Sequence, residues 1–418
     1  MLFLHDILHR NIQMKYIVIL GDGMADWPIK EFGDKTILQR AHKPYMDMMA
    51  RLGRCGMYKT VPDGYTPGSE VANMAVMGYD VPKVFQGRGV LEAANMGIEL
   101  GNGDMGMRCN LICIENGNIK NHSAGHITTE EADQLIRYLD KELGNDSVHF
   151  HTGIQYRHLL VIKNGCKDLE CTPPHDVPGS PFRPLLVKAK TPGAQQTADL
   201  LNSLILRSQE ILEQHPINIA RKQAGKDMAN SIWPWSPGYR PQMEPVSSKF
   251  PHIKSCSVIS AVDLIKGIGH YAGMKVIDVE GATGLFNTNY ENKANAAIDA
   301  LRTDNFVYVH VEAPDEAGHE GNVPLKLQTV EDLDRRLIGP IFEAVKNWDE
   351  PVAFAVLPDH PTPCLHRTHT SDSIPFLIYY PGIEPDSVQC YDEQSCKAGS
   401  YGTIEGTRFA DIFLNIHK

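Results

Sequence analysis

Two apolar runs near the end of the chain each lead into one aspartate and one histidine. The runs are residues 306–311 and 352–357, and the polar residues that follow them are Asp315, His319, Asp359 and His360. Continuous apolar runs of this length are typical of strands in a parallel sheet that helices cover on both faces. Ligands of such open α/β sheets bind beyond the carboxyl ends of the strands. The sequence therefore predicts that these side chains meet at one edge of a sheet.

A third histidine, His369, follows in the stretch His-Thr-Ser-Asp. Carboxylate oxygens combined with imidazole nitrogens suit Mn²⁺, Zn²⁺ or iron better than Ca²⁺. We therefore expect a site for two metal ions, with further ligands from the N-terminal part of the chain. A histidine in a solvated loop is the ordinary alternative for His369, and His366 is the second candidate for the same role.

The N-terminal part begins with another apolar run, residues 14–20, which predicts a buried strand. It ends in Gly21-Asp22-Gly23, where the glycines allow a sharp turn and leave Asp22 at the carboxyl end of the strand. An aspartate that only caps the next helix is the plain alternative. The position at a strand end, like that of Asp359, favours a ligand.

Ser69 follows a Pro-Gly turn and precedes residues 71–77, which are predicted to be helical. Backbone N–H groups and the helix dipole favour an anion at such an N-terminus. A serine that only caps its helix is common. A serine beside a metal ion can instead act as a nucleophile that coordination activates.

The chain of 418 residues is long for a single compact domain. Short strands, loops and a proline-rich tract fill residues 89–255, whereas an α/β rhythm occupies residues 14–88 and resumes at 256–418. We therefore predict a discontinuous α/β core with a doubly wound sheet and a smaller inserted α+β domain. Residues 1–13 are expected to be either a short arm or the product of an upstream start.

Composition excludes some functions. The formal net charge of -11 argues against non-specific nucleic-acid binding. No apolar run approaches the roughly 20 residues of a membrane span, and the N-terminus lacks the features of a signal peptide. The nine cysteines are scattered without metal-binding or disulfide spacing, which favours free thiols and a cytoplasmic protein. The sequence leaves the oligomeric state open.

Taken together, the motifs resemble the metal and nucleophile set of the alkaline phosphatase superfamily. Within it, the chain is similar to the archaeal-type branch of cofactor-independent phosphoglycerate mutases, and the resemblance covers nearly everything after residue 14. Further matching stretches are Gly87-Arg88-Gly89, Arg108-Cys109-Asn110, Tyr156-Arg157-His158, Pro173-Pro174-His175-Asp176, Ile232-Trp233-Pro234-Trp235 and residues 312–321. The resemblance implies an alkaline-phosphatase-like fold.

The resemblance also implies how the ligands divide. One metal ion would be held by Asp22, Ser69, Asp359 and His360, and the other by Asp315, His319 and His369. Mn²⁺ is the expected ion, with Mg²⁺ or Zn²⁺ as alternatives. Two ions about 4 Å apart can clamp the oxygens of a phosphoryl group during in-line displacement. Ser69 is then the catalytic nucleophile, and a phosphoserine forms during the interconversion of 3-phosphoglycerate and 2-phosphoglycerate in glycolysis.

The chain departs from the family at residues 121–126, Asn-His-Ser-Ala-Gly-His, where members commonly carry Asp-Arg-Ser-Ala-Gly-Arg. His122 and His126 thus replace arginines that are expected to face the substrate, and histidine lacks their permanent charge and forked geometry. The substrate contacts predicted for this small phosphorylated molecule are Ser123, Arg157 and Lys226, although capping or surface charge would also explain these residues.

The lost arginines favour one alternative, a phosphotransferase analogous to homoserine kinase on the same metal core. A metal-dependent phosphatase or phosphodiesterase is a second alternative. A binding protein without activity is a third class, and it is disfavoured because every expected ligand is present in the sequence.

Overall fold

The computed structural model describes residues 14–416, so the expected N-terminal arm lies outside the described part. The chain divides into two compact units, which are described separately below. The core unit comprises the described residues up to Phe85 and those from Gln242 onward; the inserted unit is Gln86–Pro241. Residues 242–255, which sequence texture assigned to the insertion, therefore belong to the core unit. There they form α10 (Val246–Lys249) and lead into the next strand.

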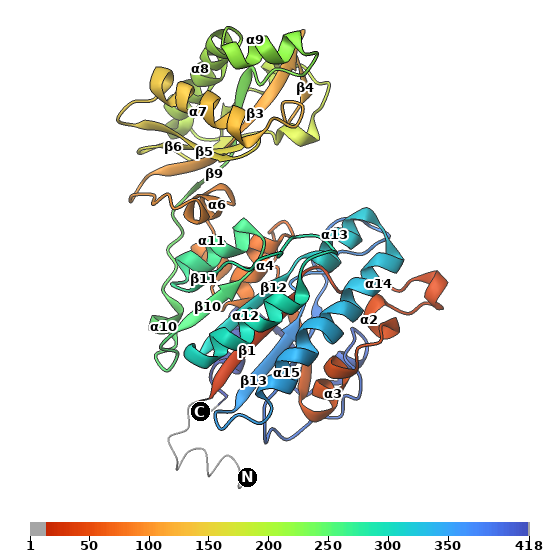
Figure 1. Ribbon diagram of the computed structural model, residues 1–418. Helices are drawn as coiled ribbons and strands as arrows, with labels where there is room; N and C mark the ends of the chain where they lie inside the picture. Colours follow the sequence, from red (N-terminus) through yellow and green to blue (C-terminus); the bar gives the residue numbers. More distant parts are fainter. Residues whose placement is uncertain (1–13, 417–418) are drawn as a thin grey trace. The chain divides into compact units, whose positions relative to one another are not determined.

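The core unit is built on an eight-stranded sheet in the order β11-β10-β12-β1-β13-β14-β2-β15 (Figure 1). The strands are β1 (Lys15–Gly21), β2 (Arg54–Lys59), β10 (Cys256–Ile259), β11 (Lys275–Ile277), β12 (Phe306–Val311), β13 (Val352–Leu357), β14 (Ile374–Tyr379) and β15 (Thr403–Glu405). Only β14 runs against its neighbours, and the other pairs are parallel. The predicted α/β class is confirmed.

Helices cover both faces of this sheet. They are α2 (Ile37–Arg40), α3 (Pro44–Leu52), α4 (Ser69–Val76), α5 (Val81–Val84), α11 (Asp263–Tyr271), α12 (Tyr290–Thr303), α13 (Ala313–Glu320), α14 (Val323–Asp332), α15 (Gly339–Val345) and α16 (Arg408–Phe413). Ile17 and Ile19 of β1 join a core cluster with α3, α12 and α15. Tyr16 points to the opposite face, where its ring meets Phe413 of α16 edge-on. The sheet is thus doubly wound.

The inserted unit has its own sheet and core. Its strands are β3 (Met105–Glu115), β4 (Asn118–Asn121), β5 (Val148–Ile154), β6 (Arg157–Ile162) and β9 (Ser231–Tyr239), with a small pair β7 (Leu169–Glu170) and β8 (Lys188–Ala189). Its helices are α6 (Gly89–Asn95), α7 (Thr129–Leu143), α8 (Gln195–Leu212) and α9 (Pro216–Gln223). Buried residues of α7 and α8 pack against β3, β5 and β6.

Among residues 14–416, no helix combines the length and apolarity that crossing a membrane requires. The cysteines are free thiols, and most of them are buried.

Candidate active site

The central strands deliver the polar cluster. β1 lies between β12 and β13 in parallel register, with Leu20 opposite both His310 and Leu357. The three carboxyl ends therefore fall at one edge of the sheet. Asp22 follows β1 directly, and Asp359 follows β13.

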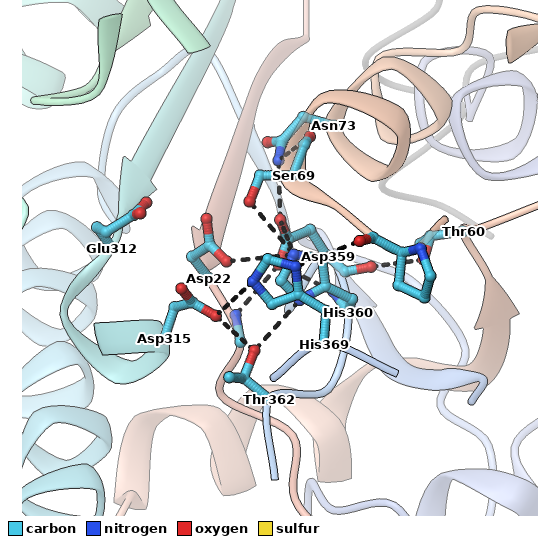
Figure 2. A network of polar contacts seen from close by, with 12 residues as sticks. Asp22, Thr60, Ser69, Asn73, Glu312, Asp315, Asp359, His360, Thr362 and His369 are labelled. Carbon is cyan, nitrogen blue, oxygen red and sulfur yellow. Dashed lines mark hydrogen bonds and ion pairs between the residues drawn. The ribbon is translucent and has the colours of Figure 1, made fainter. Parts of the chain in front are cut away.

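The imidazole of His360 lies at the centre of the first predicted ligand group, with Asp22, Ser69 and Asp359 around it (Figure 2). Nε2 of His360 is 3.2 Å from Ser69 Oγ, 3.4 Å from Asp359 Oδ2 and 3.7 Å from Asp22 Oδ1. Ser69 is the first residue of α4 and is half-buried, whereas the other three side chains are fully buried. The structure thus brings the first predicted ligand group into one place.

The second predicted group also converges. Asp315 and His319 stand one turn apart on α13, with Asp315 Oδ2 3.1 Å from His319 Nε2. Nε2 of His369 lies 3.4 Å from Asp315 Oδ1 and 3.0 Å from His319 Nε2. The ring of His369 stacks on that of His360 at 3.9 Å, so the two groups adjoin. His366, the competing candidate, is exposed and lies instead against the ring of Trp27.

The residues present fit divalent cations. Asp22 Oδ1 is buried and has no hydrogen-bond partner among the described residues. Burial raises the pKa of Asp22, and repulsion from Asp359 and Glu312 raises it further. A cation would supply the missing partner for that oxygen and would relieve this repulsion. Candidate three-ligand groups include Asp22, Asp359 and His360, and Asp315, His360 and His369.

Asp315 and His319 form a strongly coupled pair. Burial opposes ionisation of Asp315, but hydrogen bonds from His319 and His369 outweigh it and hold the pKa of Asp315 well below its usual range. The hydrogen bond to Asp315 raises the pKa of His319 to about 9. Two imidazole nitrogens 3.0 Å apart that face one carboxylate form a donor set for a single ion.

Two supporting residues were missed from sequence. Asn73 of α4, one turn after Ser69, donates to Asp359 Oδ2 and to the carbonyl of Ser69, both at 2.9 Å. Thr362 donates to Asp315 Oδ1 and lies 3.3 Å from His360 Nδ1. Both side chains are fully buried, so each fixes the orientation of a predicted ligand. The i, i+4 spacing from Ser69 was the available signal for Asn73.

His310 and Glu312 were also missed. His310 is the one histidine of the apolar strand β12, and its Nε2 lies 2.8 Å from Asp22 Oδ2. Burial lowers the pKa of His310 to about 3, whereas burial and Asp315 raise the pKa of Glu312 to about 8. A histidine in an otherwise apolar strand was the sequence signal.

The predicted substrate contacts all belong to the inserted unit. Ser123 is buried and its hydroxyl accepts the N–H of His126, as a turn-forming serine does. Arg157 is exposed at the start of β6, with its guanidinium 5.1 Å from the ring centre of Tyr156. Lys226 is exposed too. Burial lowers the pKa of His122, and electrostatic interaction with His175, His126 and Arg157 lowers it further.

One family model and several known proteins match this chain over long stretches. A family model described as 2,3-bisphosphoglycerate-independent phosphoglycerate mutase matches residues 50–218. A protein of that name from Methanosarcina barkeri is 50% identical over 403 residues, which is 96% of this chain and 99% of the relative. A probable enzyme of that name from Geobacter sulfurreducens is 44% identical, covering 96% of this chain and all of the relative (100%).

Two solved structures also match this chain over almost its whole length. A Pyrococcus horikoshii protein matches with a TM-score of 0.82 and 29% identity, covering 97% of this chain and 98% of that one. The cofactor-independent phosphoglycerate mutase of Thermoplasma acidophilum matches with a TM-score of 0.70 and 25% identity, covering 97% and 100%.

Fold and site define an α/β enzyme with a serine inside a carboxylate–histidine donor set, which is the class that the motifs indicated. The chain belongs to the 2,3-bisphosphoglycerate-independent phosphoglycerate mutase family. The family predicted from the sequence is thereby confirmed.

Proposed function

We propose that this protein interconverts 3-phosphoglycerate and 2-phosphoglycerate through a phosphoserine on Ser69. One observation carries the proposal: Ser69 Oγ stands at the N-terminus of α4 and 3.2 Å from His360 Nε2, inside the carboxylate–histidine cluster. The N-terminus of a helix favours an approaching phosphate. The high identity to mutases along almost the whole chain supports the same substrate class.

We propose that the two ligand groups hold two divalent ions, most simply Mn²⁺. Such ions would lower the pKa of the serine hydroxyl and offset charge on the phosphoryl oxygens. Asp22, Asp359 and His360 would hold one ion together with Ser69, and Asp315, His319 and His369 would hold the other. Asn73 fixes the Asp359 carboxylate, and Thr362 fixes that of Asp315.

Ser69 Oγ attacks the phosphorus of 3-phosphoglycerate, so an Oγ–P bond forms while the bond from phosphorus to the 3-oxygen breaks. The 3-oxygen takes up a proton in exchange for the one that the Ser69 hydroxyl loses, and the glycerate stays bound and reorients. Its 2-hydroxyl then attacks the phosphoserine and gives up its proton, so Ser69 is restored and 2-phosphoglycerate forms. Retention of glycerate and exclusion of water separate a mutase from a phosphatase.

Arg157, Ser123 and Lys226 are the proposed substrate contacts, with Arg157 the strongest of the three. The charge of Arg157, which also lowers the pKa of His122, supports an anion-binding surface on the inserted unit. His122 and His126 would then contribute hydrogen bonds where relatives are expected to use arginine. We further propose the cytoplasm as the site of the reaction, which suits nine free thiols.

Isotope transfer tests the reaction. Protein with Mn²⁺ but without 2,3-bisphosphoglycerate is given ³²P-labelled 3-phosphoglycerate, and products are separated after acid quenching. We expect labelled 2-phosphoglycerate, transient label on Ser69 and little free phosphate. Predominant release of inorganic phosphate would instead identify a phosphatase.

A kinase reaction is the other alternative. The relatives compared above carry mutase names, so the homoserine-kinase analogy has no support from them. Incubation with homoserine and ATP is expected to give no phosphohomoserine. Transfer to homoserine without mutase activity would overturn the proposal.

A further inference from the structure

His310 connects Asp22 to the interior of the core unit. The side chain is fully buried, with Nε2 2.8 Å from Asp22 Oδ2 and Nδ1 3.1 Å from Ser260 Oγ. Ser260 follows β10 and is itself buried. Three residues from the ends of three neighbouring strands thus form one chain of hydrogen bonds, Ser260–His310–Asp22.

The direction of these bonds follows from the donors available. A carboxylate that binds a cation is ionised and only accepts, so in the metal-binding state Nε2 of His310 carries the hydrogen and donates it to Asp22. In a neutral ring Nδ1 is then an acceptor, and the Ser260 hydroxyl donates to it. Ser260 Oγ in turn accepts the N–H of Val262 at 3.0 Å. Every polar atom of His310 therefore has a defined role, and the ring has one orientation.

The hydrogen bonds that link Ser260, His310 and Asp22 leave Asp22 with one hydrogen-bonded oxygen and one oxygen without a partner among the described residues. Oδ2 receives the His310 hydrogen bond, while Oδ1 is buried without a partner among the described residues and faces His360. We propose that His310 is a positioning residue. Held by Ser260, it turns Asp22 so that Oδ1 alone is presented to a divalent cation. This inference rests on the proposed metal-dependent function.

Glu312 provides a competing explanation. Its Oε2 lies 3.6 Å from His310 Nε2 and has no hydrogen-bond partner in the described structure. Asp22, His310 and Glu312 together have a spacing that could ligate an ion directly. In that case His310 would be a ligand. Its replacement would then abolish the binding of one ion rather than lower the affinity for that ion.

The substitutions His310→Gln and His310→Asn separate these explanations. The Gln amide nitrogen reaches the position of ring Nε2 and can still donate to Asp22. The shorter Asn amide reaches only the position of ring Nδ1, so it keeps the hydrogen bond with Ser260 and loses the one with Asp22. Each variant loses one of two buried hydrogen bonds, so their melting temperatures in EDTA should be similar. The pair is therefore matched for stability but not for the contact with Asp22.

The readout is Mn²⁺ binding to the metal-free full-length protein by isothermal titration calorimetry. We expect His310→Asn to weaken binding of one ion by about 10- to 100-fold, with unchanged stoichiometry, and His310→Gln to stay within about threefold of the parent. Excess Mn²⁺ should restore turnover of the Asn variant.

Equal Mn²⁺ affinity of both variants and the parent would overturn the positioning role while leaving the proposed function intact. Loss of one whole ion from both variants would also overturn it, because His310 would then be a ligand. A parent protein that binds no Mn²⁺ would overturn the proposed function and this inference together.

Discussion

Lys326 and Asp26 form an ion pair at 2.9 Å that is buried from solvent, with both side chains at or near zero exposure. Lys326 Nζ also donates to the carbonyls of Ala25 at 3.0 Å and Thr362 at 2.8 Å. It thereby joins the loop after β1 to the loop after β13. These loops carry predicted metal ligands on both sides of the site.

Replacing Lys326 with methionine should leave the Asp26 carboxylate buried and unpaired. We expect a loss of about 3–5 kcal/mol in the free energy of unfolding, measured by urea denaturation of the metal-free protein. The double variant Lys326→Met/Asp26→Asn removes both charges and should recover most of this loss. An unchanged urea midpoint in the single variant would contradict a structural role for the pair.

Ser69→Ala should abolish mutase turnover, with a fall of at least about a thousandfold, because no other oxygen occupies the nucleophile position. Acid-quenched ³²P labelling should detect no phosphoprotein. Mn²⁺ binding should largely persist, since six other predicted ligands remain. Full activity in this variant would end the assignment of Ser69 as nucleophile.

Metal affinity should rise with pH. The pKa of His319 is raised to about 9 in the metal-free protein, and an ion binds the neutral imidazole. Protonated His319 stabilises the metal-free fold below pH about 6.5, and that contribution disappears as pH rises through 9. We therefore expect tighter Mn²⁺ binding at pH 9 than at pH 7. Titration calorimetry in buffers of different ionisation enthalpy should show proton release that shrinks above pH 9.

Acid should destabilise the inserted unit through His158. Burial lowers its pKa to about 3, Nδ1 accepts the N–H of Gly153, and Nε2 has no partner among the described residues. The folded state holds the neutral ring, so this stability is complete above the unfolded pKa of about 6.5 and falls as pH drops towards 3. Between pH 6.5 and 5 the free energy of unfolding, measured with urea, should fall by about 2 kcal/mol more for the parent than for His158→Leu. Parallel curves for the two proteins would show that folding does not lower the pKa of His158.

Arg157→Ala should raise KM for 3-phosphoglycerate by about 10- to 100-fold, the value of a lost charge-assisted hydrogen bond. In the described structure Arg157 has no acidic partner, so its charge is available to an anion. Arg137→Ala is a control, since Arg137 is an exposed arginine of the same unit that pairs with Asp133. Steady-state kinetics with equal KM for both variants would remove Arg157 from the site.

The central strands could be predicted because burial on both faces leaves a continuous apolar run. Residues 306–311 and 352–357 coincide with β12 and β13. An apolar run does not show in which direction a strand runs, so the antiparallel strand β14 could not be distinguished from the parallel strands. Between α14 and α15 the helical path is interrupted by a π-helical turn at Leu333–Ile338, just before Pro340, which lacks an N–H. β9 contains Pro234 and Pro237, which are tolerated because this strand pairs only with β3.

Asp22, Asp359 and Ser69 could be predicted as ligands because they lie just after a strand or at a helix start. His369 lies in a loop and could be predicted only because the other ligands require a partner. Residues that orient those ligands were not readable. Lys326 has the sequence appearance of a surface lysine, yet it is fully buried. Thr362 has no local pattern, and Asn73 has only its spacing of four residues from Ser69, since the carboxylates that they bind lie far away in the sequence.

The order of the sheet has a consequence for synthesis of the protein. β1 is completed first but lies between β12 and β13, and the partners Asp22 and His310 are 288 positions apart. On the ribosome, β1 waits without neighbours while the whole inserted unit emerges with its own core. On the proposed assignment the second ion needs His369, so both ions could be held together only after residue 369 has been translated.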